Sequence, residues 1–371
     1  MQVPVQIHHM NGGEGENSYC RNSLYQKKFI LLAKPILEES IEQLCQKSSC
    51  ECLTMADFGC SSGPNTLLPL WEIIETIDST FTKLNKKLPN LLYFLNDLPG
   101  SDFNTIFRSL LPNFHQKLQK EKGKKFEHCL IGAMPGSFYG RLFPSNSLHF
   151  VHSSCCLHWS SQVPEGLVSE FGIPLHKGGI FFVNESSPAS VQKVYLDQFE
   201  KDFMKFLKSR SVEMVSGGHM VISFLAKSDK NPMQLVQDSL KQMVHEGMIQ
   251  ESKLDNFMVP LYTPCEEEVR NMIEMENSFK IKRIEEFELS WDANIEDGNN
   301  ELSFDILERG KYVASYFRAI TEPMVASHFE DANIDDLFRR LCSRVIDCLE
   351  KRIGLTKYGV ISLIKKELIP S

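Results

Sequence analysis

The sequence lacks long apolar runs and an excess of basic residues. No stretch of about 18 consecutive apolar residues occurs in the chain, so we expect no membrane-spanning helix. Among its 371 residues, Lys and Arg number 40 against 48 Asp and Glu, which gives a net charge of -8. Proteins that bind nucleic acids usually carry a basic surface. We therefore expect neither a membrane nor a nucleic acid as a partner.

The cysteines show no pairing pattern. The sequence has 11 of them, an odd number, and the closest pairs are Cys50 with Cys52 and Cys155 with Cys156. Neither pair has His or Cys partners at the spacing of a zinc site. Residues 1–10 also lack the basic and apolar segments of a secretory signal. Free thiols without a signal are typical of a reducing compartment, so we expect a cytoplasmic protein.

The order of apolar segments predicts the fold. Short apolar runs predict strands at 53–58, 91–95, 129–133, 148–152, 179–183, 220–225, 279–289 and 358–364. Apolar residues spaced three or four apart predict helices at 30–44, 67–81, 191–207, 234–244, 266–273 and 334–353. Alternating strands and helices indicate an α/β protein with a parallel sheet. Beyond residue 228 the chain becomes more helical, so we expect a helical cap, with the last strand rejoining the sheet.

A turn with two glycines follows the first expected strand. Asp57, Gly59 and Gly63 lie where the strand gives way to a helix, and glycines there let the backbone approach a ligand closely. The spacing is not the GxGxxG of dinucleotide-binding proteins. It fits the amino-acid and ribose ends of S-adenosylmethionine (SAM). By itself the pattern fits equally a tight turn with an Asp cap.

Two further strand ends carry compatible residues. Asp97 follows the second strand and could accept hydrogen bonds from ribose hydroxyls, or could be a turn residue before Pro99. Ser137 and Phe138 follow the third strand, where a small residue and an aromatic could hold an adenine. Carboxyl ends of parallel strands meet at one sheet edge, where ligands bind. Three such ends in succession indicate SAM more strongly than any one of them.

Longer motifs resemble those of a known family. The segments are MNGGEGENSY at 10–19, ADFGCSSGPNT at 56–66, LNDL at 95–98, DFN at 102–104, PGSFYGRLFP at 135–144, LHW at 157–159 and RAITEP at 318–323. Over nearly the whole chain they look like the plant SABATH methyltransferases, which methylate salicylate, benzoate, jasmonate, loganate, indole-acetate and xanthine alkaloids. The resemblance implies SAM as methyl donor, S-adenosylhomocysteine (SAH) as product, a small-molecule acceptor and a homodimer.

The resemblance also implies the architecture and the site. The fold would be a Rossmann-like SAM-binding core, residues 1–228 plus 275–371, with contributions from 229–274 and 308–353 to a helical cap over the active site. The expected cofactor residues are Tyr19, Asn22, Asp57, Cys60, Asn65, Asp97, Leu98, Ser137 and Phe138. The expected acceptor residues are Tyr25, Gln26, Cys155, His158, Trp159, Leu225, Met233, Tyr262, Ser315 and Tyr358.

Gln26 and Trp159 match the pair that grips a carboxylate in acid-methylating members. A primary amide and an indole N–H can donate to a carboxylate without neutralising it. A carboxylate is already a nucleophile at neutral pH, so catalysis would need placement rather than a base. Without the family context, Gln26 could equally be an exposed helix residue and Trp159 a core aromatic.

The sequence defines the methyl acceptor less closely than the methyl donor. His158 stands where salicylate enzymes typically carry Met, and it could act as a base or only hydrogen-bond the acceptor. Gln26 favours a carboxylate, whereas several framework stretches, among them CLIGAMP at 129–135, look most like coffee xanthine N-methyltransferases. Three hypotheses follow: a carboxyl O-methyltransferase, a xanthine N-methyltransferase, and a SAM- or acid-binding receptor without catalysis.

Pocket size and metal binding can also be predicted. Met233 and Cys155 replace bulkier residues of salicylate-type members, which favours a larger terpenoid, alkaloid or aromatic acid, or an enol. Some members bind magnesium through two Asn positions that are His176 and Met258 here. Magnesium prefers oxygen ligands, and a thioether is a poor one. We therefore expect no structural metal.

Overall fold

The computed structural model describes residues 10–228, 231–293, 305–330 and 332–367. Residues 1–9, 294–304 and 368–371 of the expected core, and 229–230 and 331 of the expected cap, lie outside the described residues. Residues 1–9 also make up most of the segment in which no secretion signal is expected. No helix in these ranges is both long and apolar enough to cross a membrane.

One seven-stranded sheet organises the chain, in the order β3-β2-β1-β4-β5-β7-β6. The strands are β1 (Cys52–Phe58), β2 (Asn90–Asn96), β3 (Cys129–Ala133), β4 (Leu148–Ser154), β5 (Met214–Leu225), β6 (Phe279–Ser290) and β7 (Leu355–Lys365). The first five run parallel, whereas β7 is antiparallel to both β5 and β6. The expected α/β class and the return of the last strand are confirmed, and the sheet is mixed rather than wholly parallel.

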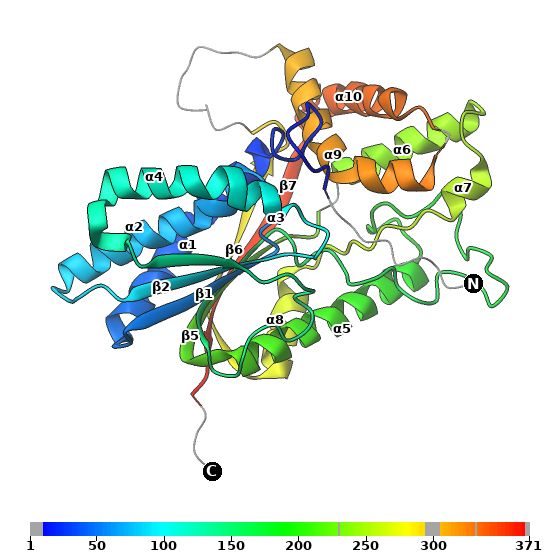
Figure 1. Cartoon of the computed structure of the whole chain (residues 1–371). Helices are drawn as coiled ribbons and strands as arrows, with labels where there is room; N and C mark the ends of the chain where they lie inside the picture. Colours follow the sequence, from blue (N-terminus) through cyan, green and yellow to red (C-terminus); the bar gives the residue numbers. More distant parts are fainter. Residues whose placement is uncertain (1–9, 229–230, 294–304, 331, 368–371) are drawn as a thin grey trace.

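The helices form layers on both sides of the sheet. They are α1 (Leu24–Lys47), α2 (Leu68–Lys83), α3 (Phe103–Thr105), α4 (Leu111–Lys122), α5 (Ala189–Glu213), α6 (Pro232–His245), α7 (Glu251–Asp255), α8 (Glu266–Glu276), α9 (Ile306–His328) and α10 (Ile334–Glu350). Figure 1 shows α1, α2 and α4 over one face and α5 and α8 under the other. Two buried hydrophobic clusters, one per face, result from this arrangement.

The prediction of a strand at 179–183 is wrong. This apolar segment makes only an isolated bridge, between Ile180 and Met258, away from the sheet. Gly179 has φ 65, and a Cβ there would lie 2.6 Å from the carbonyl oxygen of Leu254. Ile180 donates to the carbonyl of Phe257, so the segment is buried against the loop after α7. A short buried apolar run has the same composition in a strand as in such a loop.

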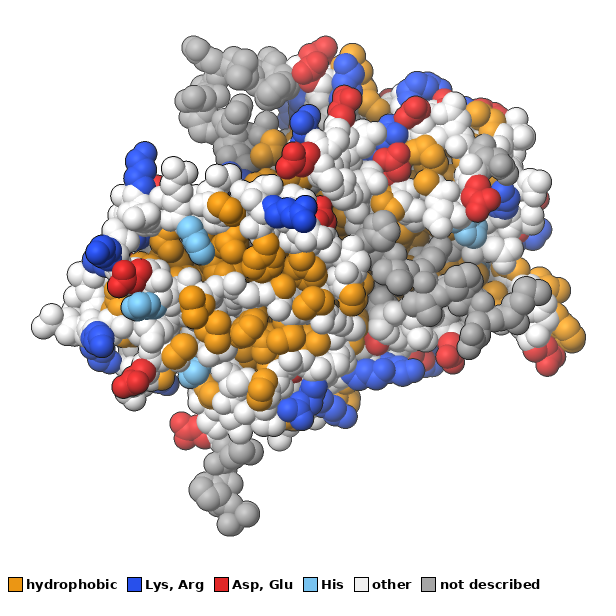
Figure 2. All heavy atoms as spheres, in the orientation of Figure 1, with side chains coloured by type: hydrophobic (Ala, Val, Ile, Leu, Met, Phe, Trp, Pro, Cys, Tyr) orange, Lys and Arg blue, Asp and Glu red, His pale blue; other side chains and the backbone are white. Residues whose placement is uncertain are grey.

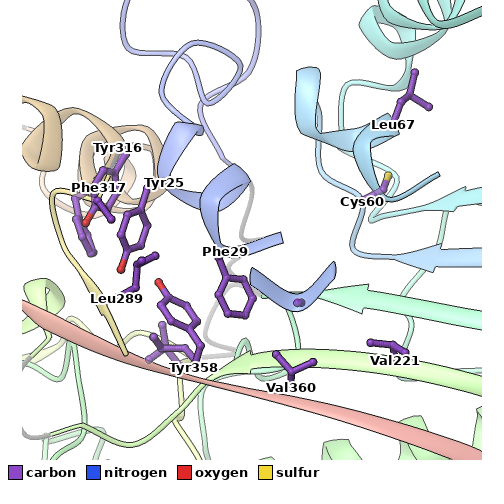
Figure 3. Packing of buried hydrophobic residues seen from close by; sticks show 14 of the residues in the cluster. Tyr25, Phe29, Cys60, Leu67, Val221, Leu289, Tyr316, Phe317, Tyr358 and Val360 are labelled. Carbon is purple, nitrogen blue, oxygen red and sulfur yellow. The ribbon is translucent and has the colours of Figure 1, made fainter. Parts of the chain in front are cut away.

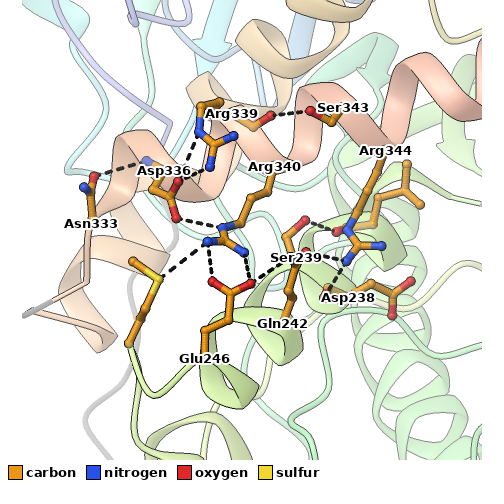
Figure 4. A network of polar contacts seen from close by, with 12 residues as sticks. Asp238, Ser239, Gln242, Glu246, Asn333, Asp336, Arg339, Arg340, Ser343 and Arg344 are labelled. Carbon is orange, nitrogen blue, oxygen red and sulfur yellow. Dashed lines mark hydrogen bonds and ion pairs between the residues drawn. The ribbon is translucent and has the colours of Figure 1, made fainter.

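Helices α6, α7, α9 and α10 gather at one end of the molecule (Figure 1). Figure 4 shows how α10 is tied to α6: Arg340 donates to both carboxylate oxygens of Glu246, at 2.9 and 2.6 Å, and to Asp336 within α10. Arg344 adds a bond to Gln242 at 2.9 Å. Helix α8, which the expected cap segment 229–274 includes, packs instead on α5 and β6 under the sheet.

On the face shown in Figure 2, hydrophobic side chains gather near β3 and α4. β3 is an edge strand of the sheet, and its Leu130 is 63% exposed. Exposed apolar surface of this kind is typical of a contact site for another molecule.

Acid should destabilise the fold through His219 of β5. Its ring nitrogens have no partner in the described chain, and burial, with Lys47 and Lys282 nearby, lowers its pKa from 6.5 to about 4. Between about pH 6.5 and pH 4 the unfolded chain therefore binds a proton that the folded chain does not. At pH 5 the free energy of unfolding should be lower than at pH 7, by about 2 kcal/mol from this residue.

Urea denaturation at the two pH values measures this loss. In His219→Leu the loss of unfolding free energy between pH 7 and pH 5 should be smaller than in wild type by about 2 kcal/mol. The substitution His115→Leu, at an exposed histidine, should leave the loss unchanged. Equal pH dependence in wild type and His219→Leu would contradict the assignment.

Candidate active site

A cavity of about 730 Å³ lies at the carboxyl ends of the parallel strands. Its wall is completed by the segment before α1 (residues 10–23, the amino-terminal arm), the start of α1, the start of α6 and one side of α9. Sixteen expected site residues line it: Tyr19, Tyr25, Gln26, Asp57, Cys60, Asn65, Asp97, Leu98, Ser137, Phe138, Cys155, His158, Trp159, Leu225, Met233 and Tyr358. The strand ends chosen from the sequence thus meet around one space.

Three expected site residues lie outside this lining. Asn22 donates to the carbonyls of Glu16 and Ser18 at 2.7 and 2.8 Å, which closes a turn of the arm. Tyr262 packs under the sheet, with its hydroxyl 2.9 Å from Glu268. The hydroxyl of Ser315 bonds back to the carbonyl of Lys311 within α9. These side chains are engaged by the protein and do not reach the cavity.

The turn after β1 is held by its neighbours in the sheet. Asp57 lies beside His152 of β4, and its Oδ1 is 2.7 Å from the histidine Nδ1. The N–H groups of Gly59 and Cys60 both donate to the carbonyl of Asn96, each at 2.9 Å. Gly59 has φ 77, and a Cβ there would lie 2.5 Å from the sulfur of Cys156. Only glycine fits this position without moving the chain.

Asp97 connects the first two strand ends. Its carboxylate accepts three hydrogen bonds of 2.7 Å, from the N–H of Ser61, the N–H of Leu98 and the hydroxyl of Ser101. Burial raises the pKa of Asp97, and these donors oppose the rise. A carboxylate has about four acceptor positions, so about one is left for a ligand.

The loop after β3 is fixed from the side of β2. The side-chain amide of Asn96 donates to the carbonyls of Met134 and Gly136, at 2.6 and 2.9 Å. Ser137 and Phe138 follow directly and line the cavity. The Phe138 ring comes within 3.6 Å of the place where a Gly59 Cβ would stand. The turns after β1 and β3 therefore face each other across the same part of the cavity.

An aromatic wall closes the other end (Figure 3). Tyr25 and Tyr316 stack with ring centroids 4.7 Å apart and planes within 1°. Tyr358 lies 6.2 Å from Tyr25 and 4.1 Å from Phe29, also centroid to centroid. The sequence analysis missed Tyr316, with Phe317 and Ile320, as lining residues of α9. Their spacing of three and four is the helical signal that could have identified this face.

His158 is held in one protonation state. Its Nδ1 accepts a hydrogen bond from the N–H of Leu225 at 3.3 Å. Burial lowers its pKa to about 3, so the ring is neutral at pH 7. With Nδ1 accepting, the single proton lies on Nε2. The imidazole can therefore donate to a ligand at Nε2 but cannot take a proton from it there.

The charged side chains that line the cavity are all acidic. The charged residues that line it within the described chain are Asp57, Asp97 and Asp102, with no Lys, Arg or Glu. Burial also raises the pKa of the Cys155 thiol and of the Tyr358 hydroxyl, so both are uncharged at pH 7. The Gln26 amide oxygen is buried without a partner in the described residues, and the amide can turn to present either group. This charge pattern favours a cationic ligand near the aspartates.

The segments aligned with the family's magnesium site contact each other. The N–H of Gly178 donates to Oδ1 of Asp255 at 2.6 Å. Within the described ranges no group of three or more His, Cys, Asp or Glu is placed to hold a metal ion. The expectation about magnesium stays a prediction.

Comparisons with known proteins give a consistent result. The family described as SAM dependent carboxyl methyltransferase matches residues 5–366. The chain is 45% identical to 3,7-dimethylxanthine N-methyltransferase 1 of Coffea arabica, over 97% of each chain. It is 44% identical to probable jasmonic acid carboxyl methyltransferase 2 of Theobroma cacao, over 98% of this chain and 99% of that one. The solved structure of a loganic acid methyltransferase with SAH is 31% identical, with a TM-score of 0.81 over 96% and 99% of the two chains.

Substitution at Gly59 should weaken SAH binding. Gly59→Ala places a methyl group against the Cys156 sulfur at a positive φ, so the turn after β1 must move. We expect the SAH dissociation constant, measured by calorimetry, to rise at least about tenfold. Gly247→Ala is the matched control, because Gly247 has a similar φ of 74 and an added Cβ there meets nothing within 4 Å. Unchanged affinity in Gly59→Ala would show that the turn does not contact the ligand.

Proposed function

The chain belongs to the SAM-dependent carboxyl methyltransferase family, known as SABATH, and from that premise we propose that it methylates the carboxylate oxygen of a terpenoid, alkaloid or aromatic acid. The enol oxygen expected as an alternative acceptor would first have to lose a proton. That the protein is a SAM-dependent methyltransferase follows from the family. We call the part of the cavity lined by Tyr25, Gln26, His158 and Tyr358 the acceptor end, and the part at the ends of β1, β2 and β3 the donor end. One observation carries the choice of a carboxylate: the Leu225 N–H donates to Nδ1 of His158, so the acceptor end has no base. A carboxylate is ionised at neutral pH and needs none.

The residues at the carboxyl ends of β1, β2 and β3 fit SAM. When bound, SAM supplies a methyl group on a positively charged sulfonium. We assign Asp57 to the cationic part of the donor and the remaining acceptor position of Asp97 to a ribose hydroxyl. Further donor contacts are proposed for Tyr19, Cys60, Asn65, Leu98, Ser137 and Phe138, all of which line the cavity. The contacts of Asn22 and its place outside the lining leave its expected role without support.

Gln26, His158 and Trp159 would orient the acceptor. Each can present a neutral donor, so a carboxylate held by them keeps its charge and its nucleophilicity. Placement of one carboxylate oxygen in line with the donor then supplies the rate enhancement, since effective molarity lowers the barrier by several kcal/mol. Tyr25, Cys155, Leu225, Met233 and Tyr358 would form the wall around the rest of the acceptor.

The second candidate is N-methylation of a xanthine alkaloid. Two observations favour it: the 45% identity to the coffee enzyme, and the stacked Tyr25 and Tyr316, which suit a flat ring. A ring N–H must lose its proton on methylation. Neither the neutral His158 nor the uncharged phenol and thiol groups of this end would accept that proton readily at pH 7.

The division into core and cap, the assembly and the location remain proposals. The packing of α6, α9 and α10 supports a cap drawn from 229–274 and 308–353, although α8 packs elsewhere. The exposed Leu130 on the edge strand β3 supports a homodimer. A cytoplasmic location is supported by the odd number of cysteines and by their free thiols.

Gln26→Ala should raise the KM for an acid acceptor. Loss of one hydrogen bond to a charged group predicts a rise of roughly ten- to a hundredfold. The measurement is transfer from labelled SAM to a panel of terpenoid, alkaloid and aromatic acids and xanthines. Gln43→Ala is the control, because Gln43 lies in the same helix and bonds to Glu39 at 3.0 Å. Turnover of xanthines but of no acid would contradict the carboxylate assignment, and an unchanged KM would contradict the role of Gln26.

An acid acceptor should bind more tightly beside a cationic donor than beside a neutral one. No Lys or Arg lines the described cavity, so the only positive charge near the carboxylate comes from the donor. Sinefungin carries an amine where SAH has a neutral sulfur. We expect acid affinity to be roughly tenfold higher with sinefungin, given the Coulomb energy of such a pair. A neutral xanthine serves as control, and equal acid affinity in both complexes would contradict this electrostatic role.

A further inference from the structure

Arg210 and Glu213 form a fully buried ion pair at the end of α5. Both side chains have no exposed surface, and Nε of Arg210 lies 2.7 Å from Oε2 of Glu213. The guanidinium also lies over the Phe58 ring, 4.1 Å from its centroid, and 5.1 Å from that of Phe206. Neither Arg210 nor Glu213 lines the cavity.

The pair binds four backbone groups of one loop. The two terminal nitrogens of Arg210 donate to the carbonyls of Phe138 and Gly140, each at 2.9 Å. Oε1 of Glu213 accepts from the N–H groups of Leu142 and Phe143, at 2.5 and 3.0 Å. These four hydrogen bonds hold the backbone of residues 138–143 against the end of α5.

A gain in stability does not explain such a pair. Removing two charges from water costs several kcal/mol for each ion, and apolar replacements of buried pairs are often equally stable. What a guanidinium offers in addition is a planar fork that fixes two carbonyl oxygens at once. The geometry of the loop is therefore what this pair determines.

The same loop forms one wall of the donor end. Asn96 holds its first residues from the side of β2, and Arg210 holds the next ones from α5. Ser137 lies between the two anchors and Phe138 is held by the second; both residues line the cavity, and the Phe138 ring lies beside Gly59. A shift of the Phe138 carbonyl would move its ring relative to the turn after β1.

We propose that Arg210, supported by Glu213, is a positioning residue that sets the affinity for SAM through the loop 138–143. The proposal rests on the donor contacts assigned above to Ser137 and Phe138. It concerns the donor alone, so it does not depend on which acceptor is methylated.

Arg210→Lys tests the proposal, because lysine keeps the charge but loses the fork. We expect the SAH dissociation constant and the KM for SAM to rise about tenfold, since bonds to charged groups are lost. The kcat at saturating SAM and the KM for the acceptor should stay within about twofold of wild type. Glu213→Gln should act in the same direction and replaces Arg210→Lys if that variant does not fold.

Ile273→Ala is the stability control. Ile273 is fully buried in α8, which packs on α5 away from the loop, so this variant should lower Tm and leave SAH affinity unchanged. Wild-type SAH affinity in Arg210→Lys would overturn the proposal, as would an equal loss of affinity in Ile273→Ala.

Phe138→Leu separates this proposal from the assignment of the donor site. If Phe138→Leu weakens SAH binding and Arg210→Lys does not, only the positioning role fails. If Phe138→Leu leaves SAH affinity unchanged, the loop does not contact the donor, and both the assignment and the proposal fail.

Discussion

The register between β1 and its two parallel neighbours is the constraint on which the site depends. It places Asp57 between Leu95 of β2 and His152 of β4, so that the Asp57–His152 bond forms across adjacent strands. It also places Asn96 where its carbonyl accepts two N–H groups of the turn after β1. A slip of one residue would turn each of these side chains to the opposite face. The pairing of the strands therefore fixes the relative positions of the residues at these strand ends.

Burial acts on the two ends of the cavity in opposite ways. At the donor end it raises the pKa of Asp97, and three hydrogen-bond donors oppose that rise. At the acceptor end burial lowers the pKa of His158, and the Leu225 N–H donates a hydrogen bond to the lone pair of its Nδ1. The first arrangement suits a ligand hydroxyl, which can donate to the remaining acceptor position, and the second suits a group that accepts hydrogen bonds and loses no proton. With the proposed acid acceptor, catalysis would consist of placing two reactants that are already reactive.

That the residues after β1, β2 and β3 line one cavity could be predicted, because parallel strands bring their carboxyl ends together. Three features could not be predicted in this way. The run at 179–183 has the composition of a strand, and only its packing shows that it is a loop. Ser315 and Tyr316 are adjacent in sequence but about 100° apart around α9, so which one faces the cavity depends on the docking of the helix. The spacing of Arg210 and Glu213 is that of an ordinary surface pair on a helix, and only their burial sets them apart.

The two ends of the cavity also differ in what holds them. Backbone bonds, glycine conformations and a buried ion pair shape the donor end, and a change in any of these moves the chain. The acceptor end is shaped by side chains such as Tyr25, Cys155 and Met233, which can be exchanged while the strands stay in place. A fixed donor end and an adjustable acceptor end allow one fold to serve different acceptors. This explains how a chain can be 45% identical to an enzyme named for a xanthine and 44% identical to one named for jasmonic acid. We therefore expect the acceptor to be decided by a few side chains on α1, α6, α9 and the segment after β4, and whole-chain similarity does not distinguish the two chemistries.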